Sequence, residues 1–184
     1  MAVLIEAISV VVKLASLFER APTGWDGFKA SLPNATLCSD NELARVGFMA
    51  AEDVRTFVEF LTASHGLIHT SNGEAVDIVV VDQLAGPRSS CSWIEYGHVN
   101  LGGNPKMRVA ACRLKGSAVR QVFTPDGWEF ENSLSHTYGF VPGGSEAKSL
   151  KFLRTQDGVD VYRNELTGKE VYVGRTGLDS GSKP

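Results

Sequence analysis

The cysteines are the residues of this 184-residue chain with the most direct nucleophilic chemistry. Cys38 lies in the stretch T-L-C-S-D-N-E-L-A-R-V-G-F (36–48), close to Asp40 and Glu42. Neighbouring carboxylates raise the pKa of a thiol and make the reactive thiolate scarcer. We therefore interpret Cys38 as a structural residue of a β-hairpin. Cys112 lies in the apolar run V-A-A-C-R-L, which predicts a core position.

Cys91 is the reactive thiol candidate of the sequence. It follows Ser89 and Ser90 at an expected boundary between a loop and a strand, where a reagent can reach it. Three cysteines without a repeated spacing indicate free intracellular thiols rather than a disulfide framework. We expect all three cysteines to be free in the native protein.

The histidine spacing does not predict a metal site. His65 and His69 are four residues apart, an offset that suits two ligands on a helix, but Gly66 between them ends the predicted helix. Zinc sites need three or four ligands, and no nearby Glu or Cys completes such a set. The glycines form neither a phosphate-binding loop nor a dinucleotide-binding motif. We therefore expect neither a metal nor a cofactor.

The strongest candidate for a binding site is the segment S-L-S-H-T-Y-G-F-V-P-G-G (133–144). It gathers polar and aromatic side chains in an expected loop, and exposed loops often carry binding residues. The alternative is that its aromatic side chains only cover the edge of a core. The predicted binding residues are Ser135, His136, Tyr138 and Phe140.

Composition and charge argue against several classes of partner. The net charge of -3 provides no positive field for nucleic acid or anionic lipid. No run reaches the length of a membrane span. Glu6 interrupts the first apolar run and no basic residue precedes it, whereas a signal peptide needs a positive segment there. We expect a cytoplasmic protein that binds neither nucleic acid nor membrane.

The first half of the chain has the pattern of a split βαβ unit. Residues 5–12 are β-branched and nearly all apolar, which is typical of a strand covered on both faces. After this strand we expect two short helices over 14–32, a hairpin over 36–48, a helix from Glu52 that ends before Gly66, and a strand over 76–84. This order is that of a ferredoxin-like sandwich, with residues 5–12 and 43–48 as its central strands.

From residue 86 onward, short β-prone segments separated by glycines predict a mostly antiparallel β half. Its expected strands cover residues 92–99, 107–114, 122–123, 150–154, 159–163 and 170–174. The predicted class is therefore α+β. Residues 1–85 would form the ferredoxin-like sandwich, residues 86–176 a β-rich half packed on it, and residues 177–184 a flexible tail.

Two functional interpretations stay open, because a ferredoxin-like fold hosts many activities. The first is a soluble, noncatalytic binding or interaction protein of the immunity type and of bacterial origin, whose acidic surface meets a basic protein partner. Homo-oligomers are compatible with it. The second is a small enzyme or ligand-binding sensor that uses a cleft between the two halves. We favour the first because the sequence contains no recognisable catalytic set, although such sets are assembled in space.

Overall fold

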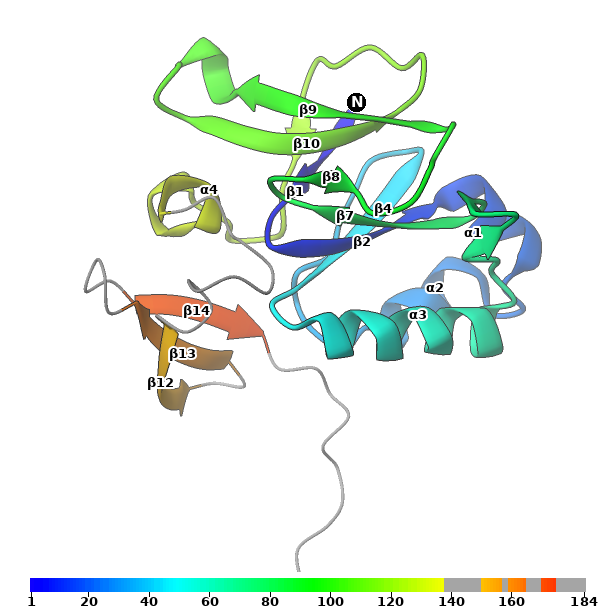
Figure 1. Cartoon of the computed structure of the whole chain (residues 1–184), viewed down its shortest axis with the longest axis horizontal. Coiled ribbons are helices and arrows are strands. Elements are labelled where there is room, and N and C mark those ends of the chain that lie inside the picture. The colour runs from blue at the N-terminus through cyan, green and yellow to red at the C-terminus, as the bar shows by residue number, and fades with distance from the viewer. Residues whose placement is uncertain (138–149, 157–158, 165–169, 175–184) are drawn as a thin grey trace, which may run out of the picture.

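The chain is a mixed α+β protein in which sheets dominate over helices, as predicted (Figure 1). The computed structural model describes residues 1–137, 150–156, 159–164 and 170–174. Within these residues the α-helices are α1 (Leu14–Arg20), α2 (Gly24–Ala30), α3 (Ala51–His65) and α4 (Leu134–Thr137). Two single turns of 3-10 helix, η1 and η2, cover Leu101–Gly103 and Phe130–Asn132.

A five-stranded antiparallel sheet forms the middle of the fold. Its order is β3-β4-β2-β7-β8, with strands Cys38–Ser39, Leu43–Phe48, Ile8–Lys13, Ile78–Asp82 and Gly86–Pro87. Strand β2 is flanked by β4 and β7, so that Val10 lies opposite both Val46 and Val80. The central positions predicted for the first apolar strand and for residues 43–48 are therefore confirmed.

Helices α1, α2 and α3 cover one face of this sheet (Figure 1). Every second residue of β2 points into this layer, where Val10 and Val12 pack with Leu17, Phe28 and Leu61. The two short helices predicted over residues 14–32 are confirmed as α1 and α2. In α1, Leu14 and Leu17 are buried, whereas Phe18 is 61% exposed.

A second sheet covers the opposite face. Its order is β11-β1-β10-β9, with strands Val122–Phe123, Ala2–Ile5, Arg108–Leu114 and Ile94–Asn100. Val11 and Val79 of the middle sheet pack against Val3, Ile5 and Cys112 of this one. In Figure 1 the described core therefore has three layers: helices, the five-stranded sheet, and the four-stranded sheet that contains β1 and β10.

The strand predicted over residues 5–12 is divided between the two sheets, which corrects that prediction. Ile5 ends β1, and β2 begins only at Ile8. Between them Ala7 has a φ of +52°, in the left-handed region that side chains other than glycine rarely adopt. Gln83 fixes this turn from both sides: its Oε1 accepts the Ala7 N–H and its own N–H donates to the Ala7 carbonyl, each at 2.9 Å.

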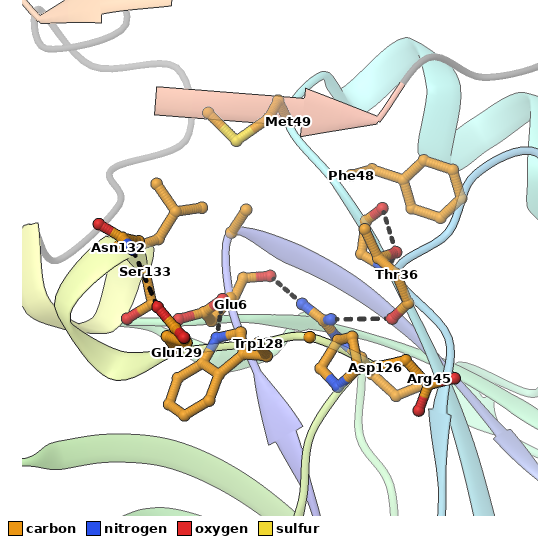
Figure 2. Close-up of a pocket in the computed structure, with 15 residues that line it drawn as sticks. Glu6, Thr36, Arg45, Phe48, Met49, Asp126, Trp128, Glu129, Asn132 and Ser133 are labelled. Carbon is orange, nitrogen blue, oxygen red and sulfur yellow. Dashed lines mark hydrogen bonds between the residues drawn. The ribbon is translucent and has the colours of Figure 1, made fainter. Parts of the chain in front are cut away.

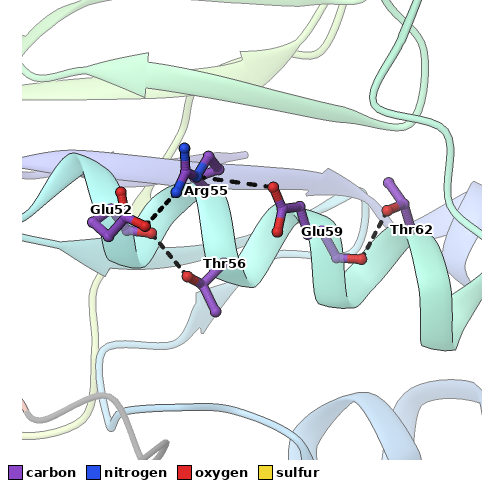
Figure 3. Close-up of polar contacts among 5 residues, drawn as sticks. All are labelled: Glu52, Arg55, Thr56, Glu59 and Thr62. Atoms are coloured by element: carbon purple, nitrogen blue, oxygen red, sulfur yellow. Dashed lines mark hydrogen bonds and ion pairs between the residues drawn. The ribbon is translucent and has the colours of Figure 1, made fainter.

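Helix α3 ends before Gly66, as the sequence predicts, and buries an apolar face. Val54, Phe57, Val58 and Leu61 are buried, and Gly66 takes the left-handed conformation with a φ of +68°. The opposite face is charged: Figure 3 shows Arg55 between Glu52 and Glu59 along the exposed side. No helix in the described part of the chain has the length and apolarity needed to cross a membrane.

The remaining strands also follow the predicted pattern. A three-stranded antiparallel sheet contains β12 (Leu150–Gln156), β13 (Val159–Asn164) and β14 (Glu170–Gly174). A small hairpin of β5 (Thr70–Ser71) and β6 (Glu74–Ala75) surrounds a turn at Asn72 and Gly73, both of which have positive φ. The division of the chain at residue 85 stays a prediction, and β1 and β10 from either side of it share one sheet. The predicted tail lies outside the described residues.

The strained turn at Ala7 gives the first testable prediction. An Ala7→Val substitution places a β-branched side chain at positive φ and should lower the free energy of unfolding by about 2 kcal/mol or more. The matched Ala7→Gly variant should stay within about 1 kcal/mol of the parent, because glycine adopts this conformation without strain. Urea denaturation measures both, and equal losses for the two variants would contradict the assignment of strain.

Candidate functional site

A pocket of about 250 Å³ opens where the chain turns from β1 into β2. Residues of the first half line one side of it and a segment between β11 and α4 lines the other (Figure 2). The pocket therefore lies between the two predicted halves of the chain. Its lining residues are Glu6, Ala7, Thr36, Arg45, Gly47, Phe48, Met49, Pro125, Asp126, Gly127, Trp128, Glu129, Asn132, Ser133 and Leu134.

Glu6 is the first of two buried charges in this pocket, with only 8% of its surface exposed. Its carboxylate accepts hydrogen bonds from Trp128 Nε1 at 3.0 Å, from the Ser135 N–H at 2.9 Å and from Ser135 Oγ at 2.6 Å. These three donors replace the water that a buried carboxylate loses. They also fasten the segment that contains Trp128 and Ser135 to the turn between the two sheets.

Arg45 is the second buried charge and is 2% exposed. Its Nε donates to Ser9 Oγ at 2.8 Å, its Nη1 to the Thr36 carbonyl at 3.3 Å and its Nη2 to the Glu6 carbonyl at 2.7 Å. All three acceptors are neutral, and none of the ion pairs among the described residues includes Arg45. The guanidinium is therefore held in place without a carboxylate bound to it.

Gly47 leaves the space in which this guanidinium lies. Residues 45 and 47 share a face of β4 because side chains alternate along a strand. A Cβ built on Gly47 would stand 2.5 Å from Nη2 and 2.8 Å from Cζ of Arg45. A side chain at position 47 would therefore displace the arginine. The position of the Arg45 guanidinium thus requires glycine at position 47.

The wall and the rim of the pocket differ in character. Phe48, Met49 and Leu134 give apolar surface, and the partly buried Trp128 adds an aromatic ring. The other acidic residues of the lining, Asp126 and Glu129, are exposed. Figure 2 shows Glu6 and Arg45 together between Trp128 and Thr36, with Met49 and Phe48 across the opening. The pocket thus combines fixed charges with an apolar surface.

The described lining of the pocket offers hydrogen-bonding groups, charges and apolar surface. Its described lining contains hydroxyls and carboxylates but no histidine or cysteine to act as a base or thiolate. Among the described residues there is also no group of three His, Cys, Asp or Glu side chains that could hold a metal ion. Fixed donors, fixed acceptors and apolar walls are features of ligand pockets.

The predicted binding segment is only partly brought to this pocket. Ser135 lies behind it and bonds to Glu6 without lining the cavity. His136 is exposed, its ring 5.3 Å from that of Phe130. Tyr138 and Phe140 lie outside the described residues, and the binding role of all four stays a prediction.

The segment begins as a helix rather than as the expected loop. Ser133 Oγ accepts the His136 N–H at 3.2 Å and thereby caps the first turn of α4. This position also directs the Ser135 N–H toward the Glu6 carboxylate. The first turn of α4 is therefore held both by the Ser133 cap and by the hydrogen bond from the Ser135 N–H to the buried Glu6 carboxylate.

The three cysteines are free, and they differ in burial. Burial raises the pKa of Cys38, with Arg45 acting in the opposite direction and Asp40 adding a smaller increase. Burial is thus the larger cause, ahead of the neighbouring carboxylate that the sequence suggested. The predicted hairpin around Cys38 is confirmed, since β3 pairs with β4 and the Asp40 carboxylate accepts the Leu43 N–H at 2.7 Å.

Cys91 and Cys112 belong to the core between the two sheets. Cys112 is completely buried, and burial raises the pKa of its thiol. Cys91 is partly buried, and burial is likewise the main cause that raises its pKa. Cys91 is therefore the most accessible of the three thiols but has less thiolate at neutral pH than an exposed cysteine. Its reactivity stays a prediction.

Sequence reasoning missed the residues that build the pocket floor. Glu6 was visible as the charge that interrupts an apolar run, and Arg45 as the charge within an apolar strand. A strand with one apolar face suggests that its charged residues face water, but every residue of β4 is buried. The available signal for both residues was a charged side chain within a run of apolar residues that predicts a strand covered on both faces.

Arg45 is expected to be essential for stability. An Arg45→Met variant keeps much of the apolar stem but leaves the Thr36 carbonyl and the Ser9 hydroxyl without their donor. We expect the free energy of unfolding to fall by about 3 kcal/mol, measured by urea denaturation. The control is Arg55→Met on the exposed face of α3, which should change it by about 0.5 kcal/mol or less. Similar losses for both would show that Arg45 is not a buried anchor.

Thiol labelling tests the order of accessibility. With iodoacetamide at pH 8, Cys91 should be alkylated before Cys38 and Cys112, and more slowly than free glutathione because burial raises its pKa. Peptide mass spectrometry gives the rate at each site. A rate at Cys91 above that of glutathione would mean that its thiolate is activated, and early labelling of Cys112 would contradict the packing between the sheets.

Comparison with known proteins gives no family for this chain. No protein-family model matches the sequence, and neither a curated protein nor a solved structure shows significant similarity to it.

Proposed function

We propose that this chain is a noncatalytic binding protein that recognises its target in the pocket around Glu6 and Arg45. The observation that carries the proposal is the buried guanidinium of Arg45, which lines a pocket and is held only by neutral acceptors. Burying a cation is costly, and proteins usually pair it with an anion. A ligand with a negatively charged acceptor would supply the anionic partner that Arg45 lacks among its three neutral acceptors.

Preorganisation supports binding as the role of this pocket. Both buried charges are fixed by hydrogen bonds. The Glu6 carboxylate accepts three, and the Arg45 guanidinium donates three. A target therefore meets groups that are already in position and does not have to order them, which lowers the entropic cost of binding. The apolar wall adds the surface that a ligand can bury.

The same contacts favour binding over acid-base catalysis. A general acid or base must exchange a proton with its substrate within hydrogen-bond reach. Both oxygens of the Glu6 carboxylate already accept hydrogen bonds, from Trp128 Nε1 on one side and from Ser135 on the other. The carboxylate is thus engaged in holding the two halves of the pocket together. A small enzyme that uses this cleft is the less supported alternative.

The pocket also accommodates the interpretation as an interaction protein of the immunity type. Asp126 and Glu129 are exposed at its rim, and Trp128 offers an aromatic face between them along the chain. A basic side chain from a protein partner would find carboxylates and an aromatic ring there, the combination that attracts cations. In this second candidate the pocket receives a residue of the partner rather than a small molecule.

We also propose a ferredoxin-like fold for the first part of the chain and a cytoplasmic location for the protein. The strand order β3-β4-β2-β7 with helices on one face supports a ferredoxin-like arrangement of residues 8–82. The odd number of free cysteines supports a cytoplasmic location. Bacterial origin, self-association and the division at residue 85 rest on the sequence reasoning alone.

A blocked pocket tests the proposal. We expect a thermal-shift screen of metabolites and of basic peptides to yield compounds that raise the Tm of the parent protein. Met49→Trp should fill the opening and abolish these shifts, whereas Leu84→Trp, at an exposed site outside the pocket, should keep them. Circular dichroism checks that both variants are folded. Shifts that survive in Met49→Trp, or a screen without any shift, would refute the proposed site.

A further inference from the structure

We infer that the ligand of this pocket is a small zwitterion with an apolar body, and specifically an apolar α-amino acid. The inference rests on the proposed function, because it names the ligand class of the same pocket. It follows from three properties of the described lining: the free donors of Arg45, the excess of carboxylates, and the apolar wall with its limited volume.

Arg45 has donors left for a carboxylate. A guanidinium carries five N–H groups, of which the Nε group and one on each Nη are used by Ser9, Thr36 and Glu6. One N–H on each Nη has no acceptor among the described residues. Two such groups on neighbouring nitrogens match the two oxygens of a carboxylate, which arginine binds in a bidentate manner. Arg45, which presents these groups, is a buried residue with an exposed fraction of 2%.

The charges of the pocket argue against a ligand that is only an anion. Three carboxylates, Glu6, Asp126 and Glu129, line the pocket against the single guanidinium of Arg45. A simple anion would therefore enter a negative field. Asp126 has no hydrogen-bond or ion-pair partner among the residues that the structure describes and is exposed at the rim, so it is available to a cation. A ligand with both an ammonium and a carboxylate satisfies Asp126 and Arg45 together.

The wall and the volume define the rest of the ligand. Phe48, Met49, Trp128 and Leu134 offer apolar surface to a side chain that carries no charge. The volume of about 250 Å³ is below the ~300–1,000 Å³ of pockets that hold drug-sized molecules. An apolar amino acid of the size of leucine, methionine or phenylalanine meets both conditions.

Isothermal titration calorimetry with matched ligands tests the inference. L-leucine, L-methionine and L-phenylalanine are compared with L-leucinamide, which lacks the carboxylate, and with 4-methylpentanoate, which lacks the ammonium. We expect at least one of the amino acids to bind and both analogues to bind about tenfold more weakly or not at all. Asp126→Asn should weaken amino-acid binding, while the control Asp26→Asn, on the exposed surface of α2, should not.

The outcomes separate the ligand class from the site. Binding of leucinamide as tight as that of leucine would refute the role of Arg45, and equal binding of 4-methylpentanoate would refute the role of the rim carboxylate. If no amino acid binds while other compounds give shifts that Met49→Trp abolishes, the inference fails and the proposed function stands. If amino acids bind Met49→Trp and the parent equally, both the inference and the proposed site fail.

Discussion

The left-handed turn at Ala7 is the constraint on which the rest of the molecule depends. It converts one apolar run into two strands that belong to different sheets, and the two sheets are thereby stacked face to face. Gln83 holds the turn by two hydrogen bonds to the Ala7 backbone, one through its side-chain Oε1 and one through its own N–H, and such surrounding contacts are what maintain a strained residue. The turn also places Glu6 and Ala7 in the lining of the pocket.

Two buried charges beside this turn connect the stability of the fold with the binding site that we propose. Glu6 binds the segment near α4, while Arg45 binds the Glu6 carbonyl and the Thr36 carbonyl, so that three parts of the chain meet at one point. Each charge is surrounded by neutral hydrogen-bonding groups instead of a direct ion pair. Burying these charges costs more desolvation free energy than an apolar core of the same size would. Buried charges of this kind are common at functional sites of proteins. Gly47 shows how closely the backbone is fitted to the guanidinium.

Most of the fold could be predicted from the sequence, because the evidence for it is local. Helix α3 follows from the spacing of its apolar residues and from Gly66, and the hairpin at Cys38 follows from the turn residues before Leu43. The break after Glu6 could not be predicted, because it depends on a contact with Gln83, far along the chain. The same holds for the site: Ser135 was selected for its loop context, whereas its observed partner, the Glu6 carboxylate, is brought to it only by the tertiary fold.

The position of β1 has a consequence for the synthesis of this protein. Residues 2–5 pair with β10 and β11, which the ribosome produces only after the whole middle sheet and its helices. During this interval the middle sheet can form from strands that are closer in sequence, while the apolar first strand waits without its partners. Contacts of such high sequence separation form slowly, and unpaired apolar strands are prone to aggregate. A nascent chain therefore leaves the apolar residues of β1 without their partner strands until β10 and β11 have been synthesised.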